Sequence, residues 1–253
     1  MIIFAADRFG AYSGVEIAAF VASLVSLKGK NVILTGLYES SSALFSVDET
    51  TTVKGISRLI LKFKNSGVTQ ADIRDNLQLT KIQGLSCLNA DERLKNHKTE
   101  AGRIGAKLLF NDVLGECDYL FLSTLGANED TVDYYARNAD EVIKLKAARV
   151  RKEALSGDEG EIFCLNGTFA DSKIGFPWFL TEYAKCGKRK NKLSSKKNLY
   201  EIPLNACVCD YINASKLDEY FLKSEFLSRG EEDYEFVGAC LELAERVMDC
   251  GTE

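Results

Sequence analysis

The sequence predicts an α/β fold: a single doubly wound, mainly parallel sheet with helices on both faces. Apolar runs of strand length alternate with helical segments along the chain, as in βαβ units. The run DYLFLS at 118–123 is almost entirely apolar, as strands buried on both faces of a parallel sheet are. No proline-rich linker, internal repeat or low-complexity segment divides the 253 residues. We therefore expect one domain over residues 1–253.

The first 38 residues predict a strand, a loop, a helix and a second strand. Residues 1–6 form an apolar run, and the loop DRFGAYSG follows it. A helix is expected from Val15 to Lys28, and a strand over 31–34. In nucleotide-binding α/β domains the loop between the first strand and its helix is aimed at a phosphate.

The rest of the chain continues the alternation. A Ser/Thr/Glu-rich connection over 37–52 comes first, and GISRLILKFK then places Ile56, Leu59, Ile60 and Phe63 on one helical face. Further helices are expected over 55–64, 70–77, 101–114, 131–137, 149–155, 177–185 and 234–248. Further strands are expected over 84–88, 118–123, 138–143, 161–166 and 199–203.

Local signals support several of these elements. Ile104, Leu108 and Val113 recur at helical spacing on the core side of 101–114. Pro177 suits the first turn of a helix. The closing helix carries acidic residues opposite its apolar stripe, so we interpret it as a core helix and not as a membrane-targeting one.

Composition indicates a cytosolic protein with reduced thiols. The net charge of 32 minus 37, or -5, favours neither nucleic acid nor an anionic membrane as a partner of the whole chain. Eight cysteines in a chain of this length, with no secretory signal, predict free thiols. The apolar run at 17–27 is too short to span a bilayer.

The loop after the first strand lacks the chemistry of a phosphate loop. A phosphate loop of the form G-x-x-x-x-G-K-[ST] uses its lysine and hydroxyl on phosphate and magnesium. Here Ser13 and Glu16 instead have the S-x-x-E spacing of a capping box. In that box each side chain would bond the amide of the other residue, and the Glu16 charge would favour the helix by about 0.3 to 1 kcal/mol while repelling a polyphosphate. Chance occurrence of so short a motif is the alternative.

Four segments in order resemble the MinD/ParA family of dimeric P-loop ATPases of the SIMIBI class. The loop resembles KGGVGKTT, and LKGKNVILTGLYES resembles KGKKVLLIDLD. CDYLFLSTLG with NADEVIKL is similar to DYIIIDTPPG with ADEVIVV, and EIFCLNGTF with LYEIPLN is similar to VLNRV with GVIPYD. The helix at 55–64 loosely resembles GLTDLLYYLK of the TadZ/CpaE-like pilus-assembly branch. The resemblance implies a P-loop NTPase fold.

The departures from the family pattern all remove residues that the family uses to bind or hydrolyse a nucleotide. In the loop, Ser13 and Gly14 stand where the family has a phosphate lysine and a magnesium-binding threonine. Gly36 and Ser123 stand where it has two aspartates, one positioning the attacking water and one supporting magnesium. The degenerate phosphate-loop positions are Arg8, Gly10, Ala11, Ser13, Gly14 and Glu16.

A triphosphate needs its charge neutralised before transfer, so we expect no ATPase activity and no cofactor. Asn166, Pro203 and Asn205 match the family's adenine-side positions and are retained. ATP with Mg²⁺ would be a ligand only under the alternative that the chain is an ATPase with an atypical loop, in which Arg8 is the cation.

A basic and aromatic segment is the candidate partner surface. Residues 185–197 hold seven basic residues and no acidic one, and clustered cations attract anions regardless of sequence. A solvated loop, or aromatic packing at a helix start, is the simpler interpretation. The surface residues concerned are Phe176, Trp178, Phe179, Lys188, Arg189, Lys190 and Lys192.

Two other kinds of site are weakly indicated. Cys164, Cys186, Cys207 and Cys209 would be the ligands of a Cys₄ metal site, but no C-x-x-C pair is present. We therefore expect no metal. His97 is the one histidine, and no motif around it indicates catalysis.

These observations predict a non-catalytic ParA/MinD-like pseudo-ATPase, a scaffold or positioning factor in pilus or secretion assembly. We expect a protein partner and a cytoplasmic location, with any recruitment to the inner face of the membrane left to that partner. A nucleotide-binding ATPase and a sequence-nonspecific DNA-binding partition-type protein are the alternatives. The sequence does not indicate an oligomeric state.

Overall fold

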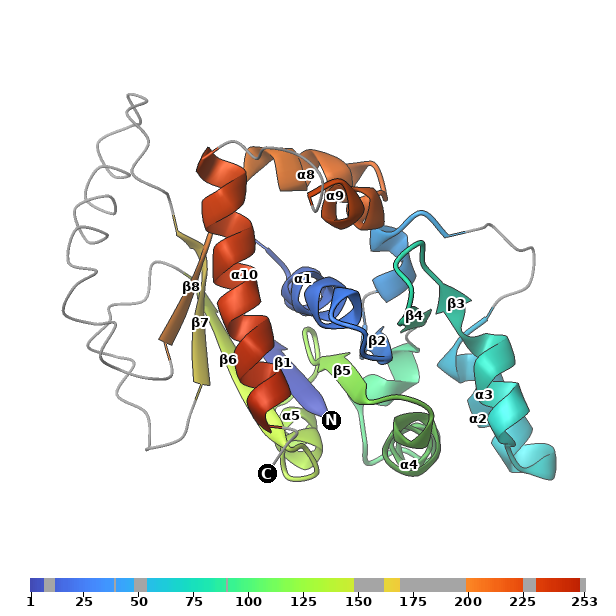
Figure 1. Cartoon of the computed structure of the whole chain (residues 1–253). Coiled ribbons are helices and arrows are strands. Elements are labelled where there is room, and N and C mark those ends of the chain that lie inside the picture. Colours follow the sequence, from blue (N-terminus) through green and yellow to red (C-terminus); the bar gives the residue numbers. More distant parts are fainter. Residues whose placement is uncertain are drawn as a thin grey trace.

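The computed structural model describes residues 1–6, 12–38, 40–47, 54–89, 91–147, 162–168, 199–224 and 231–250. Their strands form one sheet in the order β3-β4-β2-β5-β1-β6-β7-β8 (Figure 1). Every neighbouring pair is parallel except β3 with β4. The predicted single, mainly parallel sheet is confirmed. The strands are β1 (Ile2–Ala6), β2 (Val32–Gly36), β3 (Gln78–Leu79), β4 (Leu85–Leu88), β5 (Tyr119–Ser123), β6 (Glu141–Ala147), β7 (Ile162–Thr168) and β8 (Leu199–Pro203).

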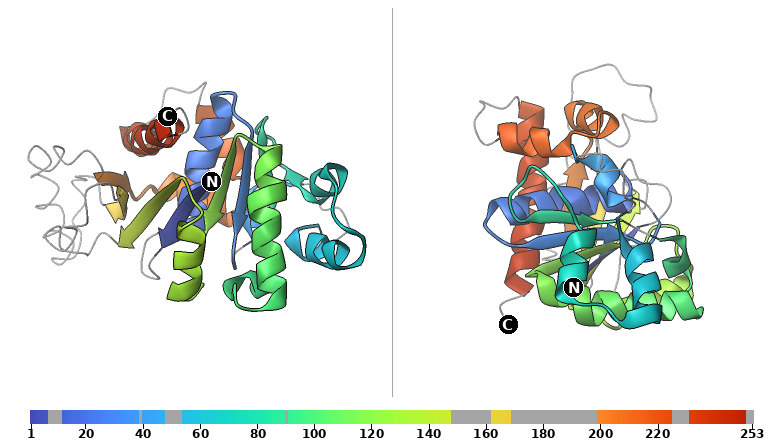
Figure 2. Two further views of the ribbon diagram at one scale, coloured as in Figure 1. Left: turned by 90° about the horizontal axis from the view of Figure 1, so that it is seen from below. Right: turned by 90° about the vertical axis from the view of Figure 1, so that its right-hand side faces the viewer.

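Helices cover both faces of this sheet, as predicted. Figure 2 shows α1 and α10 on one side of the sheet and α4 and α5 on the other. The α-helices are α1 (Gly14–Leu27), α2 (Ile56–Ser66), α3 (Gln70–Asn76), α4 (Glu100–Lys107), α5 (Glu129–Ala136), α8 (Ala206–Asn213), α9 (Leu217–Ser224) and α10 (Glu231–Cys250). Short 3₁₀ segments lie at η1 (Ser41–Leu44), η2 (Glu92–Lys95) and η4 (Leu114–Glu116).

Helix α1 is the most deeply enclosed of the described helices. It lies between the sheet and α10, and α9 also contacts it. Twelve of its 14 residues are buried, so its sequence is apolar nearly all round, as in helices enclosed on every side. Phe20 on α1 packs edge-on against Phe236 of α10, with ring centroids 5.1 Å apart. This core therefore holds the start of α1 in a fixed position.

The opposite face is built by α2, α4 and α5. Ile56, Leu59 and Ile60 of α2 are buried as their spacing predicts, and Phe63 is partly buried. Helix α4 comes close to the segment containing η2, because a Cβ added at Gly105 would lie only 2.1 Å from a methyl carbon of Leu94. The helix predicted over 101–114 is α-helical only to Lys107 and continues as a π-helix over Leu108–Val113.

Other elements differ from the sequence-based expectation. Strand β3 and helices α8 and α9 were not predicted, and β6 begins at Glu141, later than expected. Both α8 and α9 have only eight residues, so the buried Val208, Leu217, Tyr220 and Phe221 give each helix a short apolar pattern. The helices predicted over 149–155 and 177–185 lie outside the described residues.

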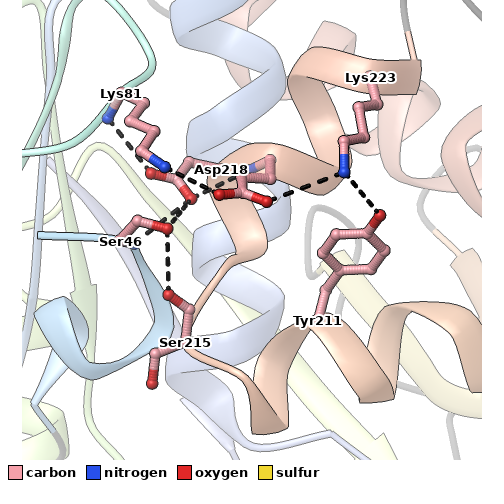
Figure 3. Close-up of polar contacts among 7 residues, drawn as sticks. Ser46, Lys81, Tyr211, Ser215, Asp218 and Lys223 are labelled. Carbon is pink, nitrogen blue, oxygen red and sulfur yellow. Dashed lines mark hydrogen bonds and ion pairs between the residues drawn. The ribbon is translucent and has the colours of Figure 1, made fainter.

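A buried carboxylate fastens α9 to two distant segments (Figure 3). Asp218 is fully buried. It accepts hydrogen bonds from the hydroxyl of Ser46 at 3.0 Å, from the amides of Ser46 and Lys81 at 3.3 Å each, and from the Glu219 amide at 2.9 Å. Lys81 also forms an ion pair with Glu219 at 2.8 Å. We call this group, Asp218 with Ser46, Lys81 and Glu219, the Asp218 joint.

Among the described residues, no helix combines the length and the apolar character that crossing a membrane requires.

Candidate functional site

Those sequence-predicted site residues that the structure describes lie at one edge of the sheet. The strands β1, β2, β5, β7 and β8 run parallel, so their carboxyl ends lie on the same side. Ligands of open α/β sheets bind at this edge. Arg8, Gly10 and Ala11 lie outside the described residues.

The first turn of α1 is self-capped, as predicted. Ser13 is the N-cap, and its hydroxyl accepts a hydrogen bond from the Glu16 amide at 3.3 Å. The Glu16 carboxylate accepts one from the Ser13 amide at 2.5 Å. Gly14 is the first helical residue and is buried. The box engages two amides of the turn, so a carboxylate occupies the position in front of the helix where an anion would be attracted.

Gly36 and Ser123, the positions without the family's carboxylates, are direct neighbours. They are register partners at the ends of β2 and β5, and Ser123 is only 1% exposed. The Ser123 hydroxyl has no hydrogen-bond partner among the residues that the structure describes. Neither position supplies a negative charge for a cation at this edge.

The candidate adenine-side residues lie at the ends of β7 and β8. Asn166 is the register partner of Ile202, and a β-bulge between Asn166 and Thr168 brings Thr168 opposite Pro203. Asn205 is the N-cap of α8 and is only 2% exposed. The edge therefore holds these residues together, with Asn205 enclosed by its own chain.

Every hydrogen-bonding group of Asn205 has a partner within the chain. Its side-chain oxygen accepts from the Val208 amide at 3.0 Å, and its side-chain nitrogen donates to Asp233 at 2.8 Å. Its backbone amide donates to the Tyr12 hydroxyl at 2.8 Å. Its carbonyl accepts from the Cys209 amide at 3.2 Å. An outside ligand would have to break one of these bonds to use Asn205.

Tyr12 is the residue that sequence reasoning missed. It precedes the N-cap of α1 and is 3% exposed, with its ring against Phe20 and Phe236. Burial raises the pKa of Tyr12 well above its ordinary value, so the hydroxyl stays protonated. A large aromatic residue between two loop glycines, in GAYSG, was the available signal.

Asp233 at the start of α10 completes this corner. Its carboxylate accepts hydrogen bonds from Asn205 at 2.8 Å and from the Tyr220 hydroxyl at 3.0 Å. Burial, followed by the charge of Asp233, raises the pKa of Tyr220. Helices α8, α9 and α10 therefore meet at one polar group.

Of the two weaker candidates, His97 packs and hydrogen-bonds within its own chain. The ring of His97 stacks on Tyr134 at 4.6 Å and hydrogen-bonds the Thr131 hydroxyl at 3.1 Å. No group of His, Cys, Asp and Glu side chains suited to a metal occurs among the described residues. Cys186 and the side chain of Cys164 lie outside them.

The predicted partner surface is not part of the described structure. Phe176, Trp178, Phe179 and the basic residues of 185–197 fall in the range 169–198. Their role remains a prediction.

No protein-family model matches the chain, and no curated protein matches its sequence. Solved structures do match its fold. One is the MinC:MinD cell division protein complex of Aquifex aeolicus, with a TM-score of 0.63 and 16% identity over 98% of this chain and 95% of that one.

Two further matches are a ParA family ATPase and a MinD protein. The ParA family ATPase from Chlorobium tepidum has a TM-score of 0.62 and 10% identity, over 96% of this chain and 97% of that one. The septum site-determining protein MinD from Pyrococcus horikoshii, complexed with Mg-ADP, has a TM-score of 0.58 and 13% identity, over 97% of this chain and 95% of that one. The chain therefore has the fold of the MinD/ParA-family ATPases.

Proposed function

We propose that this chain is a non-catalytic protein with the MinD/ParA fold that acts as a scaffold or positioning factor for a protein partner. Proteins of similar fold include cell-division and partition proteins. One of the similar structures is that of a MinC:MinD complex. We further propose a cytoplasmic setting in pilus or secretion assembly, with contact through Phe176, Trp178 and the basic residues of 185–197. Any association with a membrane would then come through the partner.

The negative charge at the first turn of α1 is the observation that carries the non-catalytic part of this proposal. Glu16 sits at the positive end of the helix dipole, held there by the Ser13 amide. A nucleoside triphosphate brings several negative charges to the start of α1 and needs lysine and Mg²⁺ to neutralise them. A carboxylate there opposes that binding.

The chemistry around this turn supports the same conclusion. Gly36 and Ser123 are uncharged and adjacent, so they offer no carboxylate to a magnesium shell, for which carboxylates are the usual protein ligands. The polar groups of Asn205 are engaged with Tyr12, Val208 and Asp233. Phosphate, magnesium and base would therefore each lack a favourable contact.

Calorimetry of the full chain with Mg-ATP tests the proposal. We expect no saturable heat and no rise in melting temperature at millimolar nucleotide. The Pyrococcus horikoshii MinD protein, whose structure contains Mg-ADP, is the positive control. A saturable signal, or a rise of several degrees in melting temperature, would overturn the proposal and favour the ATPase alternative.

A Glu16→Gln variant isolates the charge. Glutamine at this position of a capping box can still accept the Ser13 amide, so the helix start is kept while the charge is removed. We expect inorganic phosphate to bind this variant more tightly than the wild type. Equal affinity would show that the Glu16 charge does not exclude anions.

A further inference from the structure

The side chain of Tyr12 packs between α1, α10 and the start of α8, in a buried space that we call the Tyr12 site. Its ring packs edge-on against Phe20 with centroids 5.0 Å apart, and lies 6.0 Å from the ring of Phe236. Apolar walls with a few well-placed polar groups are the usual features of a small-molecule site.

The polar end of this site is the peptide edge of Asn205. The Asn205 amide donates a hydrogen bond to the Tyr12 hydroxyl at 2.8 Å. The same hydroxyl donates one to the Asn205 carbonyl oxygen at 3.4 Å. One hydroxyl therefore faces both a donor and an acceptor of a single residue. A planar heterocycle or amide with a neighbouring donor and acceptor would use this edge in the same way.

This edge lies far from Tyr12 along the chain and is closed by packing. The two residues are separated by 193 positions, and both are nearly fully buried. The Asn205 side chain is in turn held by Asp233, which also accepts from Tyr220. The contact therefore connects the start of α1 to the starts of α8 and α10.

We propose that Tyr12 is a built-in ligand. Its phenol fills a site suited to a small planar aromatic molecule, and its hydroxyl takes the hydrogen-bonding edge that such a molecule would need. The chain thereby holds the corner between α1, α8 and α10 closed without any bound molecule. This inference goes beyond the proposed function.

The main test removes the ring in the full chain. Tyr12→Ala should leave a cavity the size of the lost side chain, and buried apolar cavities of this kind bind small aromatic molecules. We expect 4-methylphenol, which reproduces the tyrosine side chain, to raise the melting temperature of Tyr12→Ala saturably. Toluene, which lacks the hydroxyl, should raise it less. The wild type should respond to neither.

Phe121→Ala is the matched control, because Phe121 is a fully buried aromatic residue of the same core. Any response of this variant to 4-methylphenol should not exceed its response to toluene. A folded Tyr12→Ala protein that gains nothing from 4-methylphenol, or gains as much from toluene, would overturn the proposal.

Tyr12→Phe provides a second test if the alanine variant does not fold. It keeps the ring and removes the hydroxyl, so the Asn205 amide loses its acceptor. We expect hydrogen exchange at that amide to become about tenfold faster. Unchanged exchange would overturn the proposal.

The two proposals fail separately. Binding of Mg-ATP to the wild type contradicts the non-catalytic function, whereas the Tyr12 proposal is decided by the response of its own variants.

Discussion

Glu16 and Asp218 are two carboxylates that both accept backbone hydrogen bonds, but their partners lie at very different distances along the sequence. Glu16 is partly exposed and bonds the amide of a residue three positions away. Asp218 is fully buried and bonds groups of Ser46 and Lys81, which are 172 and 137 positions away. The first carboxylate organises one helical turn, and the second joins three segments of the molecule.

The difference explains why we give only one of these carboxylates a part in the proposed function. Asp218 is enclosed by the chain, and the groups that donate hydrogen bonds to it are directed at its carboxylate (Figure 3). Glu16 lies at the carboxyl edge of the sheet, where a ligand would approach. Its charge is therefore available to act on an incoming anion, while that of Asp218 contributes to stability.

Asp218→Ala is expected to have the largest effect on the stability of the fold. The Ser46 and Lys81 amides would lose a buried acceptor, and we expect the free energy of unfolding to fall by about 2 to 4 kcal/mol. Urea denaturation measures this change, with Asp75→Ala as control because Asp75 is exposed. A loss no larger than that of the control would show that the joint does not stabilise the fold.

A smaller effect is expected from Ser13→Ala at the first turn of α1. Loss of the N-cap hydroxyl leaves the Glu16 amide without its acceptor and should cost about 1 kcal/mol. The same urea titration applies, and Ser66→Ala at the exposed end of α2 is the control. If Ser13→Ala cost as much as Asp218→Ala, the distinction between a local and a long-range carboxylate site would be wrong.

A third carboxylate, that of Asp91, extends the comparison to the dependence of stability on pH. Burial alone would raise the pKa of Asp91, but hydrogen bonds from Arg93 and Ser57 outweigh it and lower this pKa to about 2. The pKa of an aspartate in an unfolded chain is about 3.9. The ionised Asp91 therefore adds stability above pH 4, and this contribution is lost as the pH falls towards 2.

Urea midpoints of wild type and Asp91→Asn between pH 6 and pH 2 measure this effect. We expect the advantage of the wild type to shrink over the acidic part of the range. A constant difference would mean that Asp91 does not titrate as its contacts indicate.

Much of the candidate site was predictable because its signals are local. The spacing of Ser13 and Glu16 predicted the box, since a hydrogen bond between residues three apart depends on little else. Gly36 and Ser123 were identified by the resemblance of their segments to the MinD/ParA family, and the apolar runs before them predicted the strands that they follow or end. By contrast, the contact of Tyr12 with Asn205 joins distant segments, and no spacing in the sequence could indicate it.

The sequence by itself determined the alternation of strands and helices, the parallel sheet and the self-capped turn, because each depends on periodicity or on neighbours within a few positions. Only the tertiary structure decided that Tyr12 closes the corner at Asn205, that Asp218 fastens α9, and that α8 and α9 form at all. These features arise from side chains that packing brings together across 137 to 193 positions, so their partners are chosen by the folded core.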